Sequence, residues 1–282
     1  MNKVLFYVGL LSLYSCSPLP TTSLYTRQLQ GDWGMNVAIN STDPISIFST
    51  SSTGPYFSFQ GQQCTYFYLS QTYHDFALKE DTLILERLPY HQESTVKDSF
   101  QILHLQEDSL VLSTINGHQS DTFRLKKLTP QNEVELQSLV FQSGPCHGKC
   151  PMQYIELDSS GQLTFHGVRH TTKKGFYSGQ LSKKKLEDVL QKIHQLDLDD
   201  LQESYIAPWI HDRTCALVLT TTNETYKSSA LGQYKEPIAL RLLFHELEGL
   251  YQKTFLESDS IMDRNFYNNT IYPTPLPPPP VE

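Results

Sequence analysis

The sequence predicts an α+β protein made of two folded domains. The first is an antiparallel β-barrel or sandwich, and the second is an α+β domain with its helices on one face of an antiparallel sheet. At 282 residues the chain is longer than most proteins that have a single core. Its 16 Tyr and 14 Phe favour β-structure. Apolar residues recur at helical spacing in two segments, and both lie in the second half of the chain.

Residues 1–15 have the pattern of an export signal. Lys3 supplies a positive start, and residues 4–13 form an apolar run shorter than the roughly 20 residues that a membrane span needs. The sequence Leu13-Tyr14-Ser15-Cys16 then resembles the lipobox of bacterial lipoproteins. This resemblance implies cleavage before Cys16 and lipidation of Cys16. The alternative is an ordinary secretory signal, in which Cys16 follows the apolar run by coincidence and is not lipidated.

The expected location and partners follow from this signal and from the charge. Cleavage would remove Lys3 and change the formal net charge from −8 to −9. A negative chain without basic runs argues against nucleic acid and against a polybasic membrane patch. We therefore expect a bacterial envelope protein on the periplasmic side of the outer membrane. Its lipid would hold it to the membrane, and its partner would be a small apolar ligand or an envelope protein.

The segment 31–128 carries the β-domain. Residues 16–30 before it are predicted to be a polar tether. Short alternating or aromatic runs follow, with turn residues between them, and this pattern is typical of an antiparallel sandwich or barrel. The expected strands are 33–39, 44–49, 55–60, 64–69, 73–79, 82–88, 96–105, 109–115 and 121–128.

The start of this domain resembles a known family. Gly31-Asp32-Trp33 resembles the Gly-x-Trp that opens the first strand of lipocalin-like barrels, and 31–128 is similar to the short lipocalin-like domains of bacterial lipoproteins. Trp33 itself is expected to be a large core residue that closes one end of the sheet. Whether a cavity lies above it, or the interior is filled by Phe and Tyr, stays open at this point.

A linker at 129–142 is expected to join the domains, with a short helix or strand at 132–139. The second domain should occupy 143–256, and residues 257–282 should be a disordered, proline-rich tail. Within the domain, Ser159-Ser160-Gly161 is a turn between two strands, and Ser182 is the N-cap of the first helix. The expected elements are strands 154–158, 163–167, 175–181, 216–219 and 221–228, and helices 182–196 and 237–255.

The segment Cys146-His147-Gly148-Lys149-Cys150-Pro151 stands at the start of this domain. A Cys146–Cys150 disulfide needs Cα atoms within roughly 7 Å, whereas four extended residues span about 13 Å, so the loop must double back. Gly148 is expected to take positive φ for this reversal, and Pro151 to direct the chain into the next strand. The bond would contribute roughly 2 kcal/mol. Cys64 and Cys215 are expected to be buried and outside any disulfide.

A zinc site and a thiol redox centre are the alternatives for this loop. A closed zinc site needs four ligands, and the sequence shows no second Cys or His pair at the usual spacing. Thiol redox motifs are mostly Cys-x-x-Cys at a helix start, unlike the spacing here. The sequence therefore favours a structural disulfide, with no metal and no cofactor.

The same segment carries a resemblance to a family. Cys146-x-Gly148-x-Cys150-Pro151, followed by the turn glycine Gly161 and by Gly167, is similar to the bacterial envelope domains of unknown function called DUF6438. Asp212 matches an acidic position of this family. The resemblance implies no activity.

The sequence contains no catalytic motif that we could identify. The neighbouring pairs His74-Asp75 and His211-Asp212 have no nucleophile beside them in sequence. We therefore expect a non-enzymatic, membrane-anchored lipoprotein that binds a ligand or partner. The alternative is an envelope enzyme, either a thiol oxidoreductase that uses Cys146 and Cys150 or a hydrolase with its site between the domains.

Overall fold

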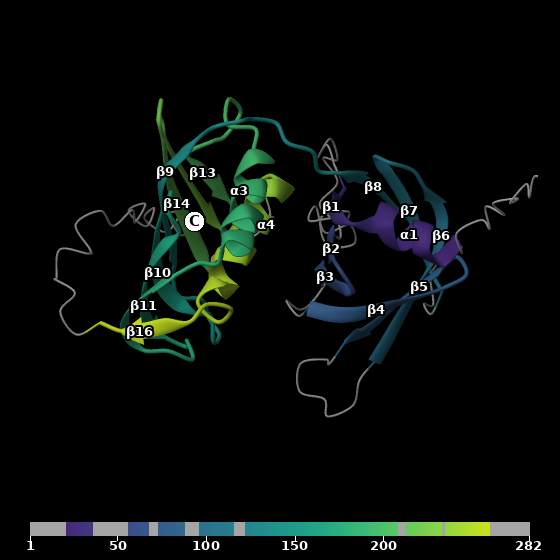
Figure 1. Cartoon of the computed structure of the whole chain (residues 1–282), viewed down its shortest axis with the longest axis horizontal. Coiled ribbons are helices and arrows are strands. Elements are labelled where there is room, and N and C mark those ends of the chain that lie inside the picture. Colours follow the sequence, from purple (N-terminus) through teal and green to yellow (C-terminus); the bar gives the residue numbers. More distant parts are fainter. Residues whose placement is uncertain are drawn as a thin grey trace, which may run out of the picture.

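The computed structural model shows two domains side by side (Figure 1). It describes residues 21–35, 56–67, 73–87, 96–115, 122–207, 213–232 and 235–259. The predicted signal segment, Cys16, the strand expected at 44–49 and the tail beyond Asp259 lie outside these residues. Among the helices that are described, none combines the length and the apolar character needed to cross a bilayer.

The N-terminal domain is a closed antiparallel barrel, as the sequence predicts. Each strand pairs with the next one along the chain, and β8 pairs back with β1 to close the sheet. The strands are β1 (Gly31–Gly34), β2 (Tyr56–Gln60), β3 (Gln63–Phe67), β4 (Tyr73–Lys79), β5 (Thr82–Arg87), β6 (Val96–Leu105), β7 (Ser109–Thr114) and β8 (Thr122–Lys127).

The interior of the barrel holds large side chains of its own. Trp33 is fully buried, and its indole N–H donates to the Leu29 carbonyl at 2.7 Å. The Lys127 ammonium lies 5.1 Å from the centre of the indole ring, which is a cation–π contact. Trp33 is a large residue of the barrel core, as expected. Around it lie further buried residues: Phe57, Phe59, Phe76, Leu83, Leu85, Phe100, Ile102, Leu110, Leu112 and Leu125.

The segment predicted to be a tether contains a helix, and the prediction for 16–30 is wrong in that part. Helix α1 (Thr21–Leu29) precedes the barrel, and Leu29 at its end is fully buried in the barrel core. This helix is hard to predict from the sequence because its residues are mostly polar, and one buried leucine makes no periodic pattern. Packing against the barrel stabilises it.

The C-terminal domain is built on one eight-stranded sheet with the order β13-β15-β14-β9-β10-β11-β12-β16. All neighbouring pairs are antiparallel except β13 and β15, which are parallel. The strands are β9 (Leu136–Ser143), β10 (Met152–Asp158), β11 (Gln162–Arg169), β12 (Gly175–Gln180), β13 (Ser204–Ile206), β14 (Thr214–Thr221), β15 (Thr225–Leu231) and β16 (Leu256–Ser258).

The short helix or strand expected at 132–139 within the linker 129–142 is a strand, and it begins later and extends to Ser143. Residues from Leu136 onward form β9, which lies between β14 and β10 near the middle of the sheet. Leu139 and Phe141 are fully buried there. Polar residues alternate with them, as is usual in a half-buried strand.

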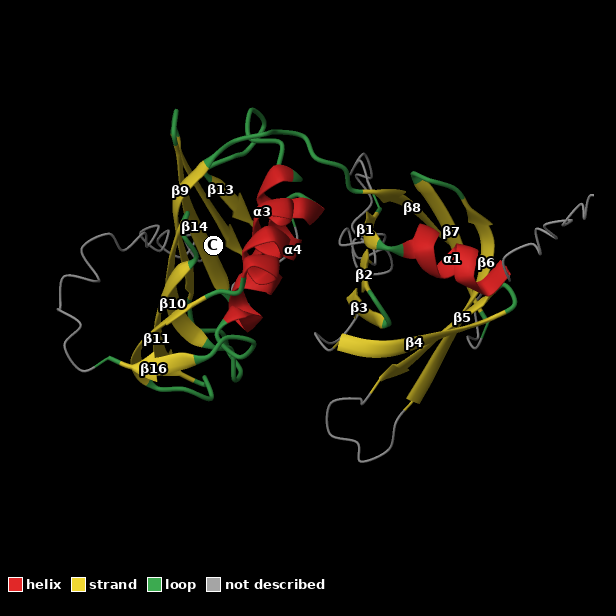
Figure 2. Ribbon diagram, in the orientation of Figure 1, coloured by secondary structure: helices red, strands yellow, loops and turns green. Residues whose placement is uncertain are grey.

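Two helices cover one face of this sheet, α3 (Lys183–His194) and α4 (Ile238–Leu250), as expected (Figure 2). Ser182 caps α3, since its hydroxyl accepts the Lys185 N–H. The helices face the barrel with their other sides (Figure 2). Gly34 of β1 lies so close to Ile238 of α4 that an added Cβ would come within 2.8 Å of the isoleucine.

Candidate functional site

The disulfide expected from the sequence is present. Cys146 and Cys150 are bonded, with 5.6 Å between their Cα atoms, in the loop that connects β9 to β10. Closing so short a loop contributes about 2 kcal/mol in the chain-entropy account. Both cysteines are half-buried, whereas His147, Gly148 and Lys149 at the tip of the loop are exposed.

Hydrogen bonds join this loop to the sheet on both sides. The Gly144 N–H donates to the Thr214 carbonyl of β14 at 2.7 Å. The Ser143 hydroxyl donates to the Pro151 carbonyl, also at 2.7 Å. Pro151 stands directly before β10, in the position that the sequence predicts for it. The loop is therefore held at the end of three neighbouring strands.

The prediction for Gly148 is wrong. Gly148 does not have positive φ, and an added Cβ would meet only the Cys146 sulfur at 3.7 Å, an ordinary contact. Its N–H instead donates to that sulfur at 3.2 Å. The reversal is distributed over the loop, so it does not need a left-handed residue at this position. Gly161 does have positive φ, at +86°, in the turn between β10 and β11 where the sequence predicts a glycine turn.

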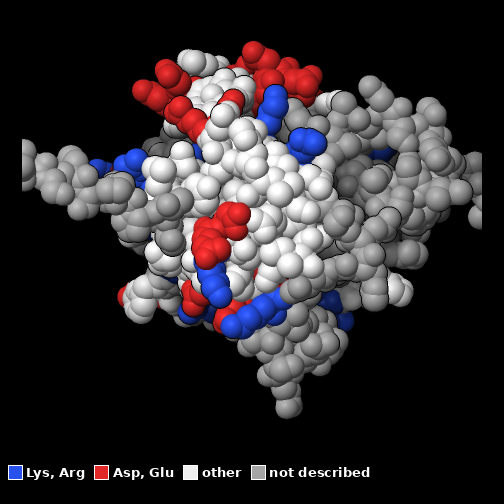
Figure 3. All heavy atoms as spheres, turned by 90° about the vertical axis from the view of Figure 1, so that its right-hand side faces the viewer, with Lys and Arg blue, Asp and Glu red and all other residues white. Residues whose placement is uncertain are grey.

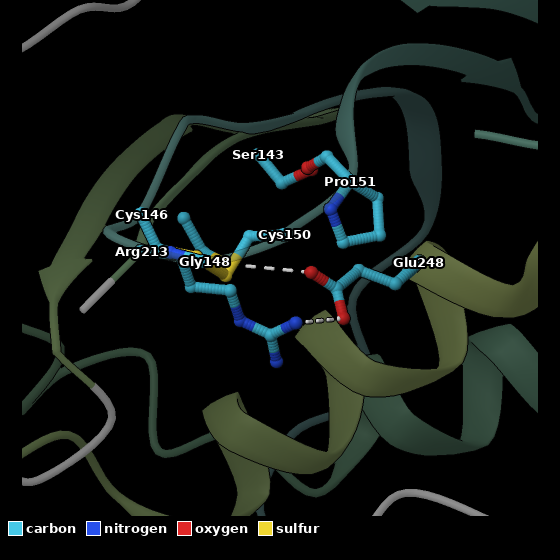
Figure 4. Close-up of a disulfide and its surroundings, with 8 residues drawn as sticks. Ser143, Cys146, Gly148, Cys150, Pro151, Arg213 and Glu248 are labelled. Atoms are coloured by element: carbon cyan, nitrogen blue, oxygen red, sulfur yellow. Dashed lines mark hydrogen bonds and ion pairs between the residues drawn. A yellow bond between two sulfur atoms is a disulfide. The ribbon is translucent and has the colours of Figure 1, made fainter. Parts of the chain in front are cut away.

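A buried ion pair lies beside the disulfide loop (Figure 4). Arg213 stands one residue before β14, and its guanidinium is 2.6 Å from a carboxylate oxygen of Glu248 in α4. Both side chains are more than nine-tenths buried. The other carboxylate oxygen of Glu248 lies 4.0 Å from the Cys215 thiol, and the Glu248 carbonyl accepts the Gln153 amide at 3.1 Å. The pair thus ties the helix layer to β10 and β14.

His245 extends this cluster toward the barrel. Its ring nitrogen Nδ1 is 3.9 Å from Glu248. Burial, followed by the positive charge of Arg213, lowers the pKa of His245 to about 3, so the imidazole is neutral at neutral pH. The ring also packs edge-on against Tyr56 of β2, with 6.3 Å between ring centres. The cluster of Arg213, Glu248 and His245 therefore reaches the contact between the two domains.

A second buried polar cluster joins the domains directly. Asp32 of β1 forms an ion pair with Lys192 of α3, and both side chains are at most 5% exposed. The same carboxylate accepts hydrogen bonds from Ser58 at 2.6 Å and from Gln195 at 2.8 Å. Burial by itself would raise the pKa of Asp32, but the charge of Lys192 and these hydrogen bonds outweigh it and lower the pKa. Asp32 is thus a charged group held between the domains.

The predicted site residues lie in separate parts of the structure and form no single site. Cys146, Cys150, Gly148 and Pro151 share the loop at one end of β10, whereas Gly161 lies past the other end. Trp33 belongs to the barrel core. The acidic position Asp212 lies outside the described residues. Across the ranges that are described, no cluster of His, Cys, Asp and Glu is arranged to hold a metal ion.

Sequence reasoning missed the charged residues of both clusters. Lys192 lies at helical spacing from Val189 and Leu196, which are apolar and buried, and Glu248 lies at such spacing from Phe244 and Tyr251. A charged residue on the apolar stripe of a helix was therefore the sequence signal that could have indicated these buried ion pairs. It is a useful one because an unpaired charge is rarely buried.

Cys64 and Cys215 are buried thiols outside the disulfide, as expected. Burial raises the pKa of the Cys64 thiol well above its ordinary value. A thiol with a raised pKa is protonated and a poor nucleophile. Among the cysteines that the structure describes, only the two of the disulfide are therefore partly exposed to solvent.

The chain was compared with known protein families, with curated proteins and with solved structures. No curated protein and no solved structure matches it. One family model matches, that of the domain of unknown function DUF6438, over residues 137–251. This range begins in β9 and ends just after α4, so it contains the disulfide loop, Arg213 and Glu248. Residues 137–251 of this chain are therefore a DUF6438 domain.

Proposed function

We propose that the protein is a lipid-anchored, non-enzymatic component of the bacterial envelope, and that it binds another envelope protein. Its N-terminal barrel is a lipocalin-like domain that serves as a scaffold. The DUF6438 domain is attached to this scaffold through the buried cluster around Asp32 and Lys192.

The packing of aromatic rings against one another in the barrel core is the observation that favours a protein partner over a small ligand. Phe57 and Phe100 pack edge-on with ring centres 5.6 Å apart, and Phe59 and Phe76 do so at 5.2 Å. All four rings are at most 7% exposed. A carrier of small apolar ligands needs a cavity lined by such residues, whereas here they contact one another. Recognition is therefore assigned to the outer surface.

The outer side of the barrel has a surface suited to a protein partner. Figure 3 shows a broad described area of mostly uncharged side chains. Asp and Glu gather along its upper edge, and a smaller group of acidic and basic side chains lies near its centre. Exposed apolar residues occur in the elements on this side of the molecule: Leu24 in α1, Leu103 in β6 and Ile115 after β7 are 39%, 57% and 47% exposed. Exposed apolar residues on a mostly uncharged surface with charged residues at its edge are typical of protein interaction sites.

The membrane anchor is tested by the Cys16→Ser variant. We expect it to leave the membrane fraction and to appear in the soluble envelope fraction, because only the lipid holds the protein there. Retention of the variant in the membrane fraction would contradict the anchor.

The binding role is tested in cells by a photoreactive amino acid at Leu103. We expect a cross-linked partner protein from this position but none from Lys183, an exposed residue of α3 in the other domain. The absence of any specific product from Leu103, or the same products from both positions, would contradict the proposed surface. The thiol-redox alternative predicts instead that Cys146 and Cys150 become reactive in mild reductant, which thiol labelling of the purified protein measures.

A further inference from the structure

A pocket lies at the edge of the DUF6438 sheet, where β16 pairs with β12 (Figure 1). Its volume is about 390 Å³, at the low end of the roughly 300–1,000 Å³ that is usual for small-molecule sites. The residues that line it come from β11, β12 and the start of β16: Gln162, Ser178, Gly179, Gln180, Phe255 and Glu257. We call it the edge pocket.

Phe255 forms the apolar side of the edge pocket. Its side chain is 81% exposed, a larger fraction than that of any other large apolar side chain in the described ranges. Phe141, Phe165 and Phe244 of the same domain are fully buried by contrast. A single exposed apolar residue is ordinary on a protein surface, but this ring stands beside a pocket of polar groups. A ligand in the pocket would cover the ring.

The backbone around Phe255 is held on both sides. Before it, the Thr254 hydroxyl donates to the Leu250 carbonyl of α4 at 2.7 Å. After it, Leu256 is buried in the core and lies opposite Gly179 of β12. Gly179 permits this close approach, because an added Cβ would lie 2.4 Å from the Phe255 carbonyl oxygen. The ring therefore stands on a fixed segment, which lowers the entropy cost of packing a ligand on it.

Polar side chains form the rest of the edge pocket. Gln162 lies opposite Gln180, and Ser178 lies opposite Glu257, so these four residues share one face of the sheet. The Gln180 amide nitrogen donates to the Ser160 carbonyl at 2.6 Å, and this bond orients the side chain. Within the part of the chain that is described, the side chains of Gln162, Ser178 and Glu257 make no hydrogen bond or ion pair. Their polar groups are therefore available to a ligand.

The groups in the edge pocket select the class of ligand. Glu257 and the glutamine oxygens accept hydrogen bonds, whereas Ser178 and the glutamine N–H groups donate them. The described residues that line the pocket include no Lys or Arg, so an anion would find no counter-charge there. An apolar ligand would leave the polar groups unpaired. A saccharide has both features that the pocket requires, namely hydroxyls that donate and accept and a face of C–H groups that packs on an aromatic ring.

We propose that the edge pocket binds one unit of a neutral saccharide. The C–H face of the sugar packs on the Phe255 ring, and its hydroxyls bond to Gln162, Ser178 and Glu257. Because the pocket lies at the edge of the sheet, the neighbouring units of a longer glycan can remain in solvent. The site belongs to the DUF6438 domain and is separate from the barrel surface around Leu103, so it adds a second kind of ligand to the proposed protein partner.

An NMR titration of the full mature chain with the Cys16→Ser change tests this proposal. The probes are cellotriose and triacetylchitotriose, two neutral β-linked trisaccharides with flat C–H faces. We expect at least one of them, at millimolar concentration, to cause saturable shifts in the side-chain amide signals of Gln162 and Gln180 and in the backbone amides of Ser178 and Glu257. Amides of β6 in the barrel should not shift. Unshifted edge-pocket signals with both probes would overturn the proposal.

Variants at Phe255 separate the role of the ring from a general surface effect. Since the side chain is exposed, its replacement should leave the fold unchanged. Phe255→Leu keeps an apolar side chain without the ring and should weaken saccharide binding about tenfold, whereas Phe255→Trp should preserve it. Leu103→Ala removes an exposed apolar side chain from the barrel and is the matched control, which should bind like the parent. Equal binding by Phe255→Leu and the parent would contradict stacking on the ring.

Choline is the probe for the competing chemistry, an ammonium ligand held by the Glu257 carboxylate and the Phe255 ring. A saccharide needs only an acceptor at position 257, so Glu257→Gln should weaken its binding by less than about tenfold. An ammonium ligand needs the negative charge itself. Edge-pocket shifts with choline but with neither saccharide, or complete loss of saccharide binding in Glu257→Gln, would refute the neutral-saccharide site.

Discussion

Removal of the cation that pairs with Asp32 should destabilise the protein more at pH 7 than at pH 5. Lys192→Met keeps the length and apolar stem of the side chain but removes the cation that Asp32 contacts. Asp32 keeps its hydrogen bonds to Ser58 and Gln195, yet its charge remains buried without a counter-charge. Breaking a buried pair in this way costs about 3–5 kcal/mol.

Protonation of Asp32 sets an upper limit on this cost. With a reference pKa of about 3.9, protonating the carboxyl at pH 7 costs about 4 kcal/mol, and at pH 5 about 1.5 kcal/mol. In the variant we expect the pKa of Asp32 to be raised in the folded state. Between pH 5 and pH 7 the folded protein then binds a proton at Asp32, whereas the unfolded protein does not. The unfolding free energy of Lys192→Met should therefore decrease as pH rises from 5 to 7, relative to the parent protein. In the parent the pKa of Asp32 is lowered, so its contribution is lost only as pH falls below about 4.

Urea denaturation at pH 5 and pH 7, followed by circular dichroism and Trp fluorescence, measures these changes. Lys183→Met is the matched control, because Lys183 lies on the same helix but is 91% exposed, and its loss should change stability by less than about 0.5 kcal/mol. Adding Asp32→Asn to Lys192→Met should recover part of the loss, since no buried charge is left unpaired. A Lys192→Met protein as stable as the control at both pH values would refute the buried inter-domain pair.

Three further predictions concern the DUF6438 domain. Replacing Cys146 and Cys150 by Ser should lower the unfolding free energy by about 2 kcal/mol, and a loss near zero in urea denaturation would show that the loop is held without the bond. Glu248→Gln should cost about 3 kcal/mol because the buried Arg213 cation loses its carboxylate partner, and a melting temperature equal to that of the parent would contradict this. The imidazole signals of His245 should show no titration in NMR spectra between pH 8 and pH 5, because its pKa is lowered to about 3, and a midpoint near 6.5 would show that the ring is exposed.

Local sequence signals predicted much of the fold. The turn at Gly161, the cap at Ser182 and the apolar faces of both helices were predicted and are confirmed. Each depends on residues only a few positions apart, whose backbone preferences hold in many contexts. The disulfide belongs to the same group, since Cys146 and Cys150 are separated by four positions.

Long-range partners could not be predicted in the same way. Arg213 and Glu248 are 35 positions apart, and Asp32 and Lys192 are 160 apart. The sequence marks a charge on an apolar helix face as unusual, but it does not say which opposite charge lies beside it. That choice depends on how the helices pack between the sheet and the barrel.

The sequence by itself determined the two-domain division, the local elements and the disulfide loop, because all of these follow from composition and short-range spacing. Only the tertiary structure decided that residues from Leu136 form a central strand, that a helix precedes the barrel, and that aromatic side chains pack against one another in the barrel core. It also decided which face of the sheet the two helices cover. These features depend on contacts between distant segments, and such contacts form only where packing of the whole chain makes them favourable.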